Sequence, residues 1–259
     1  MQIDKLTLNS RFFLGTANYP SLQILQEAII AADTEVITVS LTRAKFDAKD
    51  NKFFELLGKL PCRVLPNTAG CYSAKDAINT ARLAREVFNT QWIKLEVIAD
   101  DYTLQPNSLE LLKAAEVLIG EGFTVFPFCT DDVFICQKLV ELGCQILMPM
   151  AAPIGSGQGL LNPFNLKLLR DRFADVILII DAGIGRPSHA ALAMELGYDA
   201  ILLNSAISQA VDPVTMAKAF KLAVSAGRAA YEAGIMPERD FAVASTPYFN
   251  RPFINEREV

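Results

Sequence analysis

Short apolar segments alternate with longer amphipathic segments along nearly the whole chain, and this order constrains the fold more than any other feature. Apolar runs rich in Val, Ile, Leu and Phe are typical of buried strands, and apolar residues at helical spacing are typical of helices packed on a sheet. The expected strands are Phe12–Ala17, Glu35–Leu41, Arg63–Asn67, Trp92–Ile98, Phe123–Cys129, Gln145–Met150, Val176–Asp181 and Ala200–Asn204. The expected helices are Ser21–Ala32, Asn51–Gly58, Ala74–Phe88, Leu109–Glu121, Asp132–Leu142, Asn165–Arg170, Ser188–Leu196 and Pro213–Ala230.

Eight strand–helix repeats within 259 residues predict a (β/α)8 TIM barrel, an α/β fold that typically takes about 250 residues. A doubly wound open sheet is the alternative. It favours a Gly-x-Gly-x-x-Gly turn after the first strand, where this chain has Gly15-Thr16-Ala17-Asn18. No linker interrupts the repeats, so we expect a single barrel domain over residues 1–259. Its C-terminal tail, from about residue 232, is expected to be irregular or flexible because glycine and proline replace the helical pattern there.

Charge and composition exclude several classes of function. The formal net charge of -5 gives no attraction to nucleic acid or to an anionic membrane. The five cysteines form no Cys-x-x-Cys pair and His189 is the only histidine, so we expect no metal site and no cofactor. The first residues lack the pattern of a signal peptide, and charge or proline breaks the later apolar runs, which predicts a cytoplasmic location.

The expected strand Trp92–Ile98 carries a lysine and a glutamate in its middle. Side chains alternate faces along a strand, so Lys94 and Glu96 share a face with Trp92. Buried ions cost several kcal/mol each, roughly, unless they are paired or neutralised. Two interpretations of Lys94 follow: a structural ion pair, or a nucleophile that forms an imine with a carbonyl substrate. For the second, we expect burial, and any cationic neighbour, to lower the pKa of Lys94.

Acidic residues near the expected strand ends are candidates for proton transfer, because the C-terminal ends of barrel strands build the active site. Glu96 lies nearer to the barrel mouth than Lys94, and either passes protons to a substrate or compensates the lysine charge. Asp181 closes an apolar run, where it serves either in acid–base chemistry or as a turn residue. Arg43, after the second expected strand, is a candidate partner for a phosphate or a carboxylate.

Three loops after the last three strands are candidates for anion binding. Glycines allow the backbone to approach a ligand closely, and phosphates in such barrels are often held by backbone amides after the seventh and eighth strands. Together the loops predict a phosphorylated carbonyl substrate whose carbonyl lies at Lys94. His189 is expected to be a capping or surface residue rather than a catalyst. The loops are Ala152–Gly159, Ala182–Gly185 and Asn204–Ala206.

The chain contains a set of motifs whose sequences and order along the chain resemble those of the bacterial thiazole synthase family of thiamine biosynthesis. The resemblance covers nearly the whole chain. Ser205 stands where threonine is usual, Ala151 replaces a frequent glycine, and Ala17-Asn18 replaces a Gly-Lys pair. The motifs are Gly15-Thr16, Leu65-Pro66-Asn67-Thr68-Ala69-Gly70, Trp92-Ile93-Lys94-Leu95-Glu96, Met148-Pro149, Ala152-Pro153-Ile154-Gly155-Ser156, Asp181-Ala182-Gly183-Ile184-Gly185, Pro187-Ser188-His189-Ala190 and Asn204-Ser205-Ala206-Ile207.

The resemblance implies a transferase that makes the thiazole phosphate from 1-deoxy-D-xylulose 5-phosphate, dehydroglycine and sulfur from a thiocarboxylated sulfur-carrier protein. It implies an imine between Lys94 and the sugar, proton transfer by Glu96 and Asp181, and a homo-oligomer such as a tetramer. Alternatives are a Schiff-base aldolase acting on a phosphorylated sugar, and a barrel that binds such a ligand or a partner without catalysis. The implied positions for sugar-phosphate binding are Gly155, Ala182, Gly183, Asn204 and Ser205.

Overall fold

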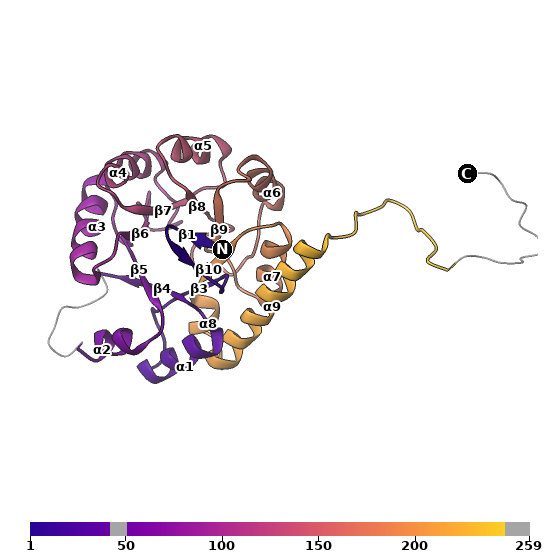
Figure 1. Ribbon diagram of the computed structural model, residues 1–259, viewed down its shortest axis with the longest axis horizontal. Coiled ribbons are helices and arrows are strands. Elements are labelled where there is room, and N and C mark those ends of the chain that lie inside the picture. The colour runs from indigo at the N-terminus through magenta and orange to yellow at the C-terminus, as the bar shows by residue number, and fades with distance from the viewer. Residues whose placement is uncertain (42–50, 247–259) are drawn as a thin grey trace, which may run out of the picture.

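The structure, a computed structural model that describes residues 1–41 and 51–246, is a closed barrel of parallel strands surrounded by helices (Figure 1). Going round the barrel, the strands follow the order β10-β3-β4-β5-β6-β7-β8-β9, which confirms the predicted (β/α)8 barrel and excludes the open sheet. The barrel strands are β3 (Phe12–Gly15), β4 (Val36–Ser40), β5 (Arg63–Asn67), β6 (Trp92–Leu95), β7 (Thr124–Cys129), β8 (Ile146–Pro149), β9 (Ile177–Asp181) and β10 (Ala200–Leu203).

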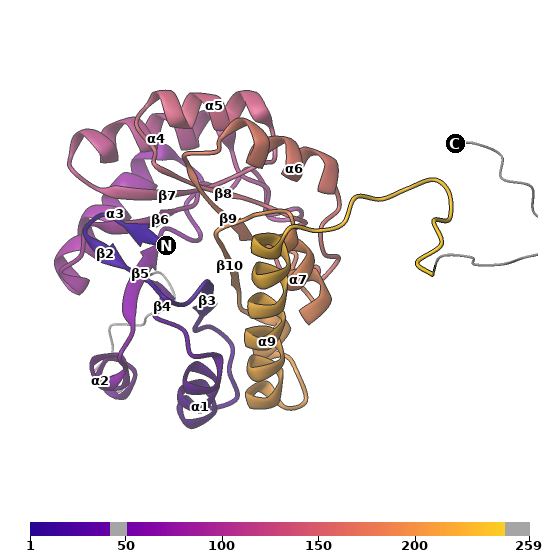
Figure 2. The same ribbon diagram turned by 45° about the vertical axis from the view of Figure 1, so that its right-hand side comes forward.

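The helices lie on the outside of the barrel, as the alternating pattern predicted (Figures 1 and 2). They are α1 (Leu22–Ala32), α2 (Asn51–Lys59), α3 (Ala74–Phe88), α4 (Ser108–Gly120), α5 (Val133–Glu141), α6 (Pro163–Arg172), α7 (Pro187–Glu195), α8 (Ser205–Ser208) and α9 (Pro213–Ala233). No helix in the described part of the chain is long and apolar enough to cross a membrane.

The alternation of side chains divides the core into two apolar clusters. Trp92 and Phe126 lie in the cluster inside the barrel, with their ring centroids 5.3 Å apart. Ile93 and Leu95, on the other face of β6, lie in the larger cluster between the barrel and the helices. The same alternation points Lys94 inward, as predicted from the sequence.

A short N-terminal hairpin closes one end of the barrel, and the sequence analysis did not predict it. Its strands are β1 (Gln2–Ile3) and β2 (Leu6–Thr7), and Ile3 belongs to the inner apolar cluster. Asp4, in the turn, accepts hydrogen bonds from Trp92 Nε1 at 2.6 Å and from Thr124 Oγ1 at 2.9 Å. Both partners begin their strands, so the hairpin covers the N-terminal ends and leaves the C-terminal ends for a cavity.

Several element boundaries differ from the predicted ones. The strand expected over Trp92–Ile98 ends at Leu95, so Glu96 follows the strand instead of lying within it. Helix α6 begins earlier than predicted because Asn162 caps it, accepting a hydrogen bond from the Asn165 N–H at 3.2 Å. After α9, residues 234–246 contain no helix or strand and extend away from the barrel (Figures 1 and 2). Arg43 and the last residues of the tail lie outside the described residues.

Candidate active site

A cavity of about 1140 Å³ opens at the C-terminal ends of the barrel strands. The hairpin closes the opposite end, so this cavity lies where barrels of this kind place their chemistry. It is lined by strand ends β3, β4, β5, β6, β9 and β10 and by the loop after β8. The structure brings together around it eight residues proposed from the sequence for catalysis or binding, whereas the candidate Arg43 lies outside the described residues: Lys94, Glu96, Asp181, Gly155, Ala182, Gly183, Asn204 and Ser205.

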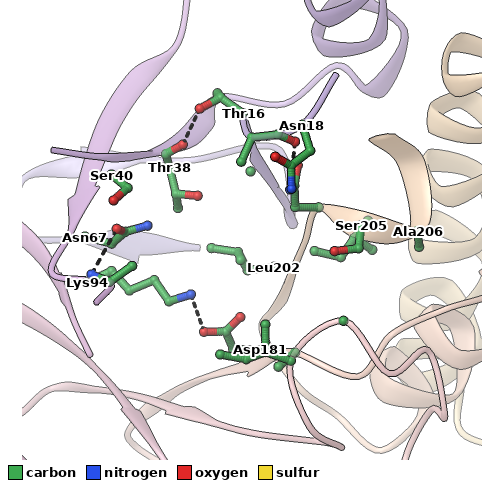
Figure 3. Close-up of a pocket in the computed structure, with 18 of the residues that line it drawn as sticks. Thr16, Asn18, Thr38, Ser40, Asn67, Lys94, Asp181, Leu202, Ser205 and Ala206 are labelled. Atoms are coloured by element: carbon green, nitrogen blue, oxygen red, sulfur yellow. Dashed lines mark hydrogen bonds and ion pairs between the residues drawn. The ribbon is translucent and has the colours of Figure 1, made fainter. Parts of the chain in front are cut away.

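Lys94 lies between two carboxylates inside the barrel. Its Nζ is 2.6 Å from Asp181 Oδ2 and 3.0 Å from Glu96 Oε1. The side chains of Lys94, Glu96 and Asp181 are only 7%, 7% and 4% exposed. Figure 3 shows Lys94 and Asp181 pointing toward each other from different strands. Each ion therefore has a partner in a site from which water is largely removed, which offsets part of the cost of burial.

The pKa prediction for Lys94 is wrong in its direction. Burial lowers the pKa of the ammonium, as expected, but attraction to Asp181 and to Glu96 raises it further, so the net pKa lies above its ordinary value. The ion-pair partners of Lys94 are two anions, which favour the charged form of a lysine. The raised pKa favours the ammonium form of Lys94, which must transfer a proton before it can act as a nucleophile.

Asp181 is the natural acceptor of that proton. Burial raises the pKa of its carboxyl, Lys94 opposes this by lowering it, and the negative charge of Glu96 raises it again, leaving the pKa above its ordinary value. Oδ2 has no partner with hydrogen-bond geometry in the described residues, although it is in ion-pair contact with Nζ. Asp181 faces the lysine and does not cap α7, whose N-cap is Arg186.

Thr68, which the sequence marks only as part of the motif Leu65-Pro66-Asn67-Thr68-Ala69-Gly70, fixes the position of Glu96. Its hydroxyl donates to the Glu96 carbonyl at 2.7 Å and accepts from the Glu96 N–H at 2.8 Å. Thr68 is fully buried. Because β6 has already ended at Leu95, the hydroxyl takes the place of the next strand-to-strand contacts and holds Glu96 beside Lys94.

The glycine loops after β8 and β9 touch through their backbones. A Cβ on Gly183 would lie 2.5 Å from the Ala152 nitrogen, and Gly183 has a φ of +77°, so only glycine fits without strain. The Gly159 N–H donates to the Gly183 carbonyl at 2.8 Å. The N–H groups of Gly155 and Gly183 donate to no other group in the described part of the chain, which leaves them available to an anion.

Asn204 joins the last strand to the first on the same side of the cavity. Its side-chain amide donates to the Ala17 carbonyl at 3.0 Å, and its Cβ lies 2.5 Å from where a Cβ on Gly15 would be. Ser205, the next residue, begins α8. A Cβ on Gly155 would lie 4.0 Å from the Ser205 hydroxyl oxygen. The three loops therefore form one surface, which we call the glycine cradle: Gly155–Gly159, Ala182–Gly185 and Asn204–Ala206.

His189 accepts a backbone N–H from just before α7, as a capping residue does, and it is less exposed than a surface residue. It is half-buried in the first turn of α7, and its Nδ1 accepts a hydrogen bond from the Gly185 N–H at 3.2 Å. A Cβ on Gly159 would lie 2.8 Å from the imidazole Cε1, so the ring also packs on the loop after β8. The sequence contained a signal for this contact: the only histidine of the chain follows a Gly-x-Gly turn by four positions.

The fold and the site together define a (β/α)8-barrel enzyme whose cavity holds a lysine between two carboxylates, beside a glycine-rich cradle suited to an anion. The family model "Thiazole biosynthesis protein ThiG" matches residues 2–247. The thiazole synthase of Coxiella burnetii (strain RSA 493 / Nine Mile phase I) is 58% identical over 255 residues, covering 98% of each chain. The thiazole synthase of Bradyrhizobium sp. (strain ORS 278) is 56% identical over 248 residues, covering 95% of each.

A solved structure agrees with these relatives. The Amycolatopsis orientalis BexX/CysO complex matches with a TM-score of 0.83 and 29% identity, covering 93% of this chain and 98% of the other. This chain belongs to the thiazole synthase family. Thiazole synthases are sulfur-incorporating transferases of thiamine biosynthesis, and the comparisons give the aldolase alternative no better support.

Proposed function

We propose that this thiazole synthase condenses 1-deoxy-D-xylulose 5-phosphate, dehydroglycine and sulfur from a thiocarboxylated carrier protein, and that Lys94 holds the sugar as an imine. One observation carries the proposal: a lysine buried between two carboxylates faces a cavity that also contains the glycine cradle. A lysine amine adds readily to a carbonyl once it has lost its proton. The protein has a net negative charge and does not attract a phosphate as a whole. Backbone amides of the cradle can bind a phosphate locally.

The two carboxylates provide a route for the protons of imine formation. The Lys94 ammonium passes one proton to Asp181, and the free amine adds to the ketone carbon. The nitrogen then loses a second proton to Glu96, and both protons move to the former carbonyl oxygen, which leaves as water. A positively charged imine remains on Lys94, stabilised by the nearby carboxylates. Asp181 suits the first step because its raised pKa favours the protonated form.

The glycine cradle would hold the phosphate through Gly155, Ala182, Gly183, Asn204 and Ser205. Gly155 and Gly183 have free amides among the described residues. The N–H groups at the start of α8 have no partner within the helix, and Ser205 adds a hydroxyl. The phosphate would bind after the last three barrel strands while the ketone reaches Lys94 on β6. The glycine cradle and Lys94 would thus bind the two ends of one phosphorylated ketone.

Borohydride reduction tests the proposal. With 1-deoxy-D-xylulose 5-phosphate present, reduction should attach the sugar to Lys94, as located by peptide mass mapping. A Lys94→Arg variant is the matched control because it keeps the positive charge near both carboxylates but forms no imine. Labelling at other lysines only, or equal labelling of the control, would show that Lys94 does not carry the sugar.

The proposal includes a protein partner and self-association. The matched BexX/CysO structure, which is a complex of two proteins, supports a carrier protein as the sulfur donor. We propose a homo-oligomer such as a tetramer, and a cytoplasmic location in keeping with five free cysteines. Light scattering during size-exclusion chromatography measures the oligomer. Turnover that proceeds equally well with free sulfide and without the carrier protein would refute the carrier as the sulfur donor.

A further inference from the structure

His189 lies against two of the three loops that make the glycine cradle, although it does not itself line the cavity in the described structure. Nδ1 accepts the Gly185 N–H at 3.2 Å from the loop after β9. The other side of the ring is against Gly159, in the loop after β8, where a Cβ would come within 2.9 Å of both ring nitrogens. The only histidine of the chain therefore lies between two loops that line the cavity.

The two loops depend on each other for their shape. A Cβ on Gly185 would lie 2.4 Å from the Gly157 carbonyl oxygen, so the two backbones are in direct contact. A second contact joins the same loops: the Gly159 N–H donates to the Gly183 carbonyl at 2.8 Å. Gly157, Gly159 and Gly183 all have positive φ, between +64° and +84°. Glycine loops of this kind have many accessible conformations, so each further contact helps to select one.

We infer that His189 is a positioning residue for the phosphate of the substrate: it holds Gly185 and Gly159 so that the amides of the cradle face one point. This inference rests on the proposed function, which puts the phosphate in the cradle. Nδ1 accepts the Gly185 N–H, so the imidazole must be neutral with its proton on Nε2. Burial lowers the pKa of His189, with a smaller contribution from Arg186, and this favours the neutral ring.

Three substitutions separate the hydrogen bond from the bulk of the ring. His189→Asn keeps an acceptor, since the carboxamide oxygen of asparagine is as far along the side chain as Nδ1. His189→Gln moves the acceptor one bond further out, to about the position of Nε2. His189→Leu fills space without any acceptor. We expect the leucine and glutamine variants to raise the KM for 1-deoxy-D-xylulose 5-phosphate about tenfold, the value of roughly one hydrogen bond, with kcat little changed. The asparagine variant should stay within about threefold of wild type.

The decisive readout is the sugar concentration that gives half-maximal borohydride labelling of Lys94, because it needs neither carrier protein nor turnover. It is measured for 1-deoxy-D-xylulose 5-phosphate and for 1-deoxy-D-xylulose without the phosphate. The leucine and glutamine variants should require a higher concentration of the phosphorylated sugar than wild type. Wild type and all three variants should require the same concentration of 1-deoxy-D-xylulose. A general loss of folding would raise the required concentration of both sugars, so an increase for the phosphorylated sugar alone indicates a defect at the phosphate.

The outcomes are distinguishable. If wild type labels equally well with both sugars, the cradle does not bind the phosphate, and the proposed function fails together with this inference. If wild type prefers the phosphorylated sugar and the glutamine variant retains that preference, the phosphate site stands and the role of His189 is refuted. Equal loss in the asparagine and glutamine variants refutes the hydrogen bond as the cause. Should the leucine variant not fold, as judged by circular dichroism, the asparagine and glutamine pair alone completes the comparison.

Discussion

Replacing Lys94 with methionine should destabilise the protein strongly, although methionine has a similar length and is apolar. The side chain removed lies 2.6 Å from Asp181 and 3.0 Å from Glu96, and all three are nearly inaccessible to solvent. In the variant two carboxylates would remain buried at the same place with no cation between them. Breaking a buried ion pair by removing one partner is costly because the other charge is left uncompensated.

The expected loss is about 3–5 kcal/mol of unfolding free energy near neutral pH. For a chain of this size, each kcal/mol corresponds to roughly 2–4 °C in the midpoint of thermal unfolding, so Tm should fall by roughly 6–20 °C. Thermal unfolding followed by circular dichroism or calorimetry measures this directly. A loss of this size would show that the lysine stabilises the fold strongly, apart from any role it has in catalysis.

The loss should depend on pH in a known direction. The pKa of Asp181 is already raised by burial, and removing Lys94 removes the influence that lowers it. A carboxyl whose pKa is higher in the folded than in the unfolded protein stabilises the fold below its unfolded pKa, and this stability is lost as pH rises through the folded pKa. The difference between variant and wild type should therefore be larger at about pH 8 than at about pH 5.

An exposed ion pair provides the matched control. Lys221 Nζ lies 2.8 Å from Asp33 Oδ2, but the two side chains are 45% and 73% exposed. Lys221→Met makes the same chemical change at a similar distance and should cost at most about 1 kcal/mol. If Lys94→Met melts like Lys221→Met, or if its deficit does not shrink in acid, the carboxylates are not held as buried ions by Lys94 and the reasoning fails.

The other predictions concern turnover and the glycine cradle. Asp181→Asn and Glu96→Gln should each lower kcat by about 10²–10⁴-fold with the affinity for the sugar phosphate retained, as single-turnover kinetics and calorimetric titration can show; near-wild-type rates would leave the carboxylates with a structural role only. Gly183→Ala should nearly abolish sugar-phosphate binding, because the added Cβ would meet the Ala152 backbone. Gly122→Ala is its control, since Gly122 also has positive φ, +81°, but no atom within 4 Å of the added Cβ, so only strain of roughly 1–2 kcal/mol is expected. Equal effects of the two alanines on binding would contradict a specific role for the contact at Gly183.

The barrel itself could be predicted from the sequence, because strand–helix alternation repeats often enough to close a sheet of this type. The inward direction of Lys94 could be predicted as well, since it depends only on the period of one strand. The end of that strand could not be predicted. Glu96 faces Lys94 as expected, but β6 ends before it and the Thr68 hydroxyl replaces the strand contacts. The N-terminal hairpin was missed because its strands are too short to show a period.

What the sequence alone determined about this chain is the order of its elements, the face on which each polar side chain lies and the family that its motifs resemble. Only the tertiary structure decided which of those side chains meet. Asp181 reaches Lys94 from β9, three strands away from β6 round the barrel, and together with Glu96 it reverses the expected direction of the lysine pKa. His189 contacts two loops at once. The physical reason is that hydrophobic periodicity reports burial along one element, whereas pKa values and loop shapes depend on distances between side chains that barrel closure alone brings together.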